Sequence, residues 1–187
     1  MVRERLDPSA VRPILRRLSE LEEEVPALAA QLAAATVGDD DTRAEAWWTL
    51  WTRAPRDQAI DEAALPAVPV LTALAGWPHY PDRVPALMLL REVACADRIT
   101  PRHDHDEFAE LREALASGIR HIASRWRTEP PEIRRALVWV LGAVPEVRVQ
   151  FHALIDETLP ADRRPEWEEQ LLGASASPAL ESWVVDG

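Results

Sequence analysis

Apolar residues recur along most of the chain at spacings of three and four, which is the period of an α-helix rather than of a strand. The clearest stripe runs through Ile14, Leu18, Leu21, Val25, Leu28 and Leu32. Pro26 falls inside this stripe. A proline costs about 3 kcal/mol in a helix interior but little in the first turn of a helix. The pattern therefore favours two helices, over 11–24 and 26–36, and leaves a single kinked helix as the alternative.

The remaining chain continues as short helices separated by turns. Gly38 ends the second helix, and Asp39, Asp40 and Asp41 are candidate N-cap and first-turn residues for the third. Prolines stand where several further helices begin. We expect these helices over about 42–53, 63–75, 81–96, 105–126, 131–141 and 145–158, with a short ninth from Pro165. They form one domain over 1–173, followed by a tail over 174–187.

Composition then removes several classes of chemistry. The 187 residues carry 32 acidic and 21 basic side chains, a net charge of -11, and every basic residue is Arg. Without Lys or Asn, Schiff-base and P-loop lysines are excluded, as is any Asn ligand. Six Gly with no Gly-x-Gly exclude Gly-rich phosphate loops, and one Cys excludes an internal disulfide and a Cys-based zinc site.

The chain also lacks the features of a membrane or exported protein. The first residues carry several Arg but no apolar core of a signal peptide. No apolar stretch approaches the roughly 20 residues that span a bilayer. We expect a soluble cytoplasmic protein that has no membrane partner.

Similar strings open two of the predicted helices, Pro-Asp-Arg-Val-Pro-Ala-Leu from Pro81 and Pro-Glu-Ile-Arg-Arg-Ala-Leu from Pro131. The second, followed by Leu-Gly at 141–142 and Pro-Glu-Val-Arg from Pro145, resembles the HEAT-repeat family, and the string from Ala64 to Leu71 is similar to the start of a second HEAT helix. The resemblance covers about 42–158 and extends to uncharacterised bacterial HEAT-like proteins. Two loops, 53–62 and 97–104, are long for HEAT repeats, so the repeats are degenerate.

The resemblance implies an all-α fold, a right-handed α/α superhelix of about eight to nine short antiparallel helices. The second helix of each pair, 63–75, 105–126 and 145–158, would form its concave face. HEAT-like proteins are mostly interaction scaffolds, and a minority are enzymes. We therefore expect a non-enzymatic module without cofactor that binds a protein partner on the concave face.

The charge pattern refines this expectation. Acidic runs at Glu22–Glu24, Asp39–Asp41 and Glu166–Glu169 favour a basic partner, for example a toxin that the chain would inhibit as a cytoplasmic immunity protein. One alternative is a small HEAT-like enzyme or small-molecule binder with a pocket on that face. Another is a nucleic-acid binder of the HEAT-like DNA-glycosylase type, which the charge of -11 disfavours.

Candidate binding residues are aromatic, titratable or basic side chains expected near the concave face. They are Trp48, Trp51, His79, Tyr80, Arg112, Arg120, His121 and Arg125. The neighbouring Trp47 shares a helix with two of them, and Trp47, Trp48 and Trp51 cannot all enter one core. His103 and His105 are weak metal candidates, because Asp104 and Glu107 fit a capping box at the start of the helix better than a ligand set.

Overall fold

A computed structural model describes residues 8–53, 64–99, 105–151 and 153, and this part of the chain contains helices and no strands. The predicted all-α class is therefore confirmed. The α-helices are α1 (Pro8–Glu24), α2 (Pro26–Val37), α3 (Asp40–Arg53), α4 (Ala64–Gly76), α5 (Arg83–Ile99), α6 (His105–Ala123), α7 (Pro131–Ala143) and α8 (Pro145–Arg148). Two 3₁₀ helices, η1 (Trp126–Thr128) and η2 (Val149–Phe151), follow α6 and α8.

The first stripe forms two helices, as the position of Pro26 predicts. Val25 lies between them with non-helical backbone angles, φ -138° and ψ 74°, and Pro26 is the first residue of α2. Pro26 thus occupies the first helical position, where a backbone N–H would have no hydrogen-bond partner within the helix. Pro131 and Pro145 begin α7 and α8 in the same way, which confirms the predicted starts.

The predicted ends of two helices are wrong, and the first of these, expected at 96, lies at Ile99. The helix expected over 105–126 ends at Ala123, because the Arg125 N–H bonds to the Ile122 carbonyl at 3.1 Å and the backbone tightens into η1. This turn buries Trp126. The helix expected over 145–158 is α-helical over Pro145–Arg148, tightens into η2, and is helical again at Ala153. Its last residues, the ninth helix from Pro165 and the tail 174–187 lie outside the described part.

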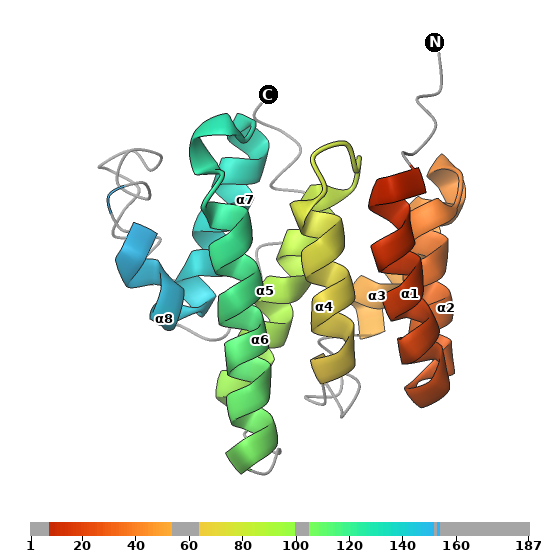
Figure 1. The fold of residues 1–187 in the computed structure, drawn as a ribbon, viewed down its shortest axis with the longest axis horizontal. Coiled ribbons are helices and arrows are strands. Elements are labelled where there is room, and N and C mark those ends of the chain that lie inside the picture. The colour runs from red at the N-terminus through yellow and green to blue at the C-terminus, as the bar shows by residue number, and fades with distance from the viewer. Residues whose placement is uncertain (1–7, 54–63, 100–104, 152, 154–187) are drawn as a thin grey trace.

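The helices lie in two layers (Figure 1). In the front layer α4 packs between α1 and α6, and behind it α5 packs against α4 and α7. From α1 to α7, consecutive helices run in opposite directions. At one end of the molecule α2 contacts α1 and α3. Apolar side chains from α1 to α8 join in one continuous core, with Leu21, Leu71, Leu87, Leu115 and Leu137 among its fully buried members.

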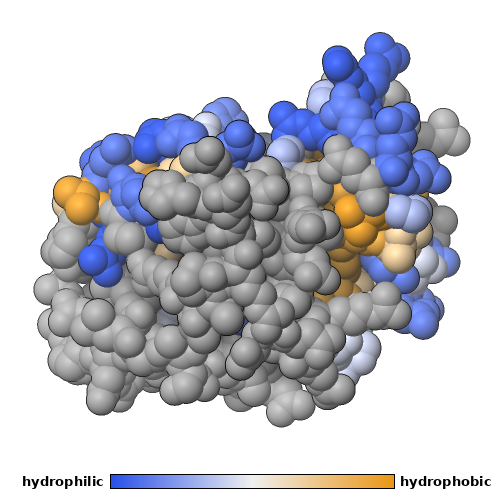
Figure 2. All heavy atoms as spheres, turned by 90° about the horizontal axis from the view of Figure 1, so that it is seen from below, coloured by the Kyte–Doolittle hydropathy of each residue, from blue (hydrophilic) through white to orange (hydrophobic). Residues whose placement is uncertain are grey.

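At the end of the molecule formed by α1 and α2, the two helices expose different kinds of side chain. In the view from below, hydrophobic surface lies next to hydrophilic surface at this end (Figure 2). Exposed Glu22 and Glu23 belong to α1, whereas α2 has no charged residue and exposes Ala27, Ala30 and Val37.

Candidate functional site on the face of α4 and α6

The closest approach between helices of the front layer is the contact of α4 with α6. A Cβ on Gly118 of α6 would collide with the Thr72 side chain of α4, and one turn further along, Gly76 faces Ile122. The two helices therefore run in the same direction, side by side, as Figure 1 also shows. Only glycine permits this separation at position 118.

The solvent-facing side of α4 carries small side chains. Pro69, Thr72, Ala73 and Gly76 are half-buried, and no side chain from 67 to 76 is fully exposed. Beyond them, α6 adds half-buried Ala114 and Gly118, and its outermost positions include exposed Ser117 and His121. We call the six half-buried residues the small-residue strip: Pro69, Thr72, Ala73, Gly76, Ala114 and Gly118.

The strip is bordered on its other side by α1. Arg17 donates a hydrogen bond from Nη1 to the Pro69 carbonyl at 2.6 Å, which ties α1 to α4. Arg16, one residue earlier, is exposed and pairs with Glu20 at 3.1 Å within its own helix. The border on this side therefore carries both charges, while the strip itself is uncharged.

The arginines of α6 that were predicted as binding residues are engaged with neighbouring elements. Arg112 donates from Nε and Nη2 to Glu146 Oε1 at 3.0 and 2.6 Å. Arg120 donates to Gln150 at 3.3 Å. Both lie on the flank of α6 that meets α8 and η2, so these side chains fasten the last described elements to α6. Sequence alone shows the arginines and their spacing but not these partners.

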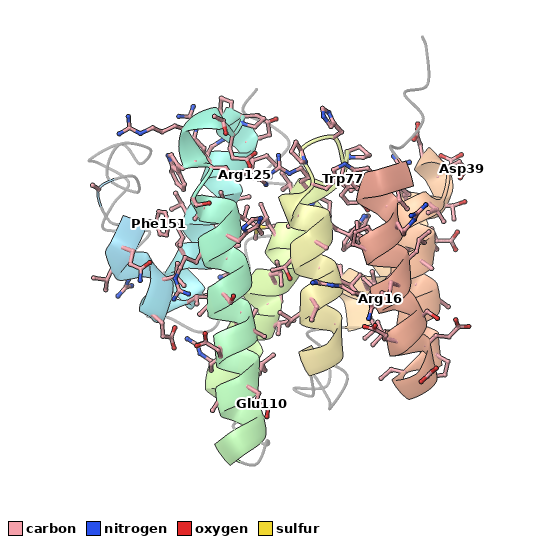
Figure 3. The ribbon with its side chains drawn as sticks, viewed as in Figure 1. Arg16, Asp39, Trp77, Glu110, Arg125 and Phe151 are labelled. Atoms are coloured by element: carbon pink, nitrogen blue, oxygen red, sulfur yellow. The ribbon has the colours of Figure 1, made fainter. Side chains whose placement is uncertain are left out.

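Arg125 belongs to a charged cluster at the other end of α6, near Trp77 (Figure 3). Its Nη2 atom donates to the Gly76 carbonyl and lies 3.3 Å from Glu129 Oε1. Buried Arg83 contacts the second oxygen of Glu129 at 2.6 Å and donates to the Ala75 carbonyl at 2.8 Å. Arg83 and Glu129 are not predictable as members of this cluster, because nothing local distinguishes them from surface charges.

Tyr80 lies in the core instead of on a binding face. Its hydroxyl donates to the Ala35 carbonyl at 2.5 Å and accepts a hydrogen bond from Trp47 Nε1 at 3.2 Å. Its ring stacks on Trp77. Burial first, and then the charge of Asp82, raise the pKa of Tyr80. His79, the residue before it, is exposed in the α4–α5 loop.

The tryptophans of α3 divide as the helix period requires. Trp47 is buried, Trp51 is half-buried and Trp48 is 65% exposed. All three lie on α3, which packs against α2 and α5 and not in the layer of α4 and α6. The eight predicted binding residues therefore do not form one site. His121 alone among them is fully exposed beside the strip.

The metal candidates fall at the edge of the described chain. His103 lies outside it, and α6 begins at His105, whose side chain is not described. Within the described residues, no group of three or more His, Cys, Asp or Glu side chains is placed to hold a metal ion. Nor does any helix there have the length and apolar character needed to cross a bilayer.

Comparison with known proteins adds no relative to this picture. The chain matches no protein-family model, no curated protein and no solved structure.

Proposed function

We propose that the chain is a HEAT-like interaction module, a right-handed stack of helix pairs that binds a protein partner over the small-residue strip. The observation that carries this proposal is the uncharged surface of small, half-buried side chains on α4 beside the close contact with α6. In a stack of helix pairs, equivalent helices of successive pairs lie side by side in the same direction. The arrangement of α4 with α6, and of α5 with α7, has this character.

The chemistry of the strip favours a protein as its partner. Small side chains let another backbone approach closely, and burial of apolar surface then supplies the affinity. A nucleic-acid partner needs exposed basic residues along its phosphates. Here Arg112, Arg120 and Arg125 are bound to Glu146, Gln150 and the Gly76 carbonyl, respectively. An inhibitor of a toxic protein is one form that such a module takes.

A large side chain placed at the edge of the strip tests whether a partner binds there. Ser117 is exposed on the α6 edge, so Ser117→Trp places a large ring over the strip without entering the core. A partner is first isolated from cells that naturally express the chain, then purified, and its Kd for each variant is measured by calorimetry. We expect Ser117→Trp to weaken binding at least about tenfold, a loss of about 1.4 kcal/mol.

The matched control is Ser19→Trp, which adds the same ring at an exposed position of α1. It is expected to leave the Kd unchanged. Equal affinity of both variants and the parent chain would refute the strip as the binding face. If a small molecule is recovered in place of a protein, and Ser117→Trp prevents it from binding, the strip binds a small-molecule ligand and not a protein partner.

A further inference from the structure

A second solvent-facing surface lies on α3, in the other part of the molecule. Asp41, Ala44, Glu45 and Trp48 are all exposed, and successive helical residues are rotated by about 100°. These four residues therefore share one side of α3, and Trp48 lies one turn beyond Ala44 and Glu45. We call these four residues the α3 face.

Trp48 is the most unusual member of this face. Its 65% exposure makes it a large ring left in water, whereas Trp47, the preceding residue, is buried against Tyr80. Exposed single apolar residues are common on proteins, but tryptophan is enriched where a partner buries it. The neighbouring helix α2 adds no charge to this end of the molecule and exposes Val37.

The described charges of the α3 face have one sign. Asp41 and Glu45 are one turn apart, so their Cβ atoms are about 6 Å from each other. Arg43 is turned inward, where it bonds to Asp82 at 2.7 Å and to the Gly38 carbonyl at 3.1 Å. Burial opposes the charge of Arg43, but its bonds to Asp82 and Asp40 outweigh this and raise its pKa. Arg43 therefore does not offset the two exposed carboxylates on the outer side.

From this combination we infer that the α3 face is a second docking surface, for a basic amphipathic helix of a partner protein. An apolar side chain of that helix would cover Trp48, and Lys or Arg side chains spaced one turn apart would face Asp41 and Glu45. Phosphate-bearing partners do not fit, because the carboxylates repel them. The α3 face shares no residue with the small-residue strip, so binding at one does not require binding at the other.

The probe is a synthetic amphipathic peptide with leucine along one helical face and lysine along the other. Its Kd is measured through the blue shift of tryptophan emission and through protection from acrylamide quenching. Two peptides serve as controls, one with glutamate in place of lysine and one with the same residues scrambled. We expect only the ordered lysine peptide to bind, with Trp48→Phe removing most of the spectral change.

Protein variants then separate the α3 face from general attraction to an acidic chain. We expect Trp48→Ala to weaken peptide binding about tenfold. The double change Asp41→Asn with Glu45→Gln should weaken it several-fold and reduce its salt dependence. Controls are Leu15→Ala, another exposed apolar side chain, and Glu110→Gln with Glu113→Gln, an exposed acidic pair on α6. Circular dichroism verifies that each variant remains helical.

Two outcomes would overturn the inference. Equal effects of the two acidic pairs would show that the peptide senses only net charge. Loss of peptide binding in Ser117→Trp but not in Trp48→Ala would move the peptide to the strip, which would leave the proposed function standing and remove the α3 face. If Ser117→Trp leaves the Kd of the strip partner unchanged while Trp48→Ala still weakens peptide binding, the proposed function fails and the α3 face stands.

Discussion

Gly118 of α6 lies so close to Thr72 of α4 that a Cβ built on the glycine would stand 2.0 Å from the Thr72 Cγ2 atom. Thr72 does not turn away freely, because its hydroxyl donates to the Val68 carbonyl within α4. This contact sets the separation of α4 and α6 within the small-residue strip.

Gly118→Ala tests this contact. In an exposed helix the change would stabilise by up to about 1 kcal/mol, but the collision with Thr72 should reverse the sign and cost about 1–3 kcal/mol. The free energy of unfolding is measured by urea denaturation. Thr72→Ser removes Cγ2 and keeps the hydroxyl, so it should recover most of the loss in the double variant. A stabilised Gly118→Ala chain would contradict the close packing.

The buried carboxylate of Glu129 holds two arginines, Arg83 at 2.6 Å and Arg125 at 3.3 Å. Glu129→Gln leaves the guanidinium of Arg83, only 3% exposed, without a charged partner. Removal of one member of a buried pair costs about 3–5 kcal/mol, and the amide should retain part of the hydrogen bonding, so we expect a loss of about 3 kcal/mol. Glu132→Gln, at an exposed position of α7, is the control and should change little. Similar losses in both variants would argue against the cluster.

Tyr80 gives a spectroscopic test, because it is the single tyrosine of the chain. Its ordinary pKa is 10.0, and burial in the folded chain raises it. The folded state therefore keeps the phenolic proton at a pH where the unfolded state loses it, so stability should fall as the pH rises above about 10. Tyrosinate absorbance should appear only as the chain unfolds. Titration near pH 10 with intact circular dichroism would show that Tyr80 is accessible.

Arg112 is expected to stabilise the packing of α8 against α6. Its hydrogen bonds to Glu146 are partly exposed, so Arg112→Ala should weaken the docking of α8 by about 1 kcal/mol. Amide hydrogen exchange over 145–151 should then become about fivefold faster. Arg16→Ala, which breaks an exposed pair within α1, should leave that exchange unchanged. Unchanged exchange in Arg112→Ala, together with loss of duplex DNA binding, would contradict the structural role and indicate that Arg112 binds nucleic acid.

The helices were predictable from sequence, because periodicity, proline positions and Asp39 act locally. Asp39 accepts the Thr42 N–H at 2.9 Å, as an N-cap does. The end of α6 was not predictable, since the 3₁₀ turn that follows it depends on the burial of Trp126. The same holds for the candidate site. Helical spacing shows that the tryptophans of α3 diverge, but only packing shows that Trp47 is buried and Trp48 exposed.

The arginines of α6 illustrate a second limit. Basic residues on a helix fit a binding face and a packing face equally well. Which of the two applies depends on Glu146 and Gln150, residues that the fold brings to Arg112 and Arg120 from α8 and η2. Long-range partners of this kind are not encoded in any local pattern.

Site-specific photocrosslinking tests the central claim most directly, since it reports contact over the strip without requiring a variant that blocks it. A benzophenone side chain is placed at Ser117 beside the strip, or at Ser19 on α1 as a control, in cells that naturally express the chain. We predict one discrete protein adduct from Ser117, competed away by the unlabelled parent chain, and none from Ser19. Adducts from Ser19 alone, or equal adducts from both positions, would contradict binding over α4 and α6.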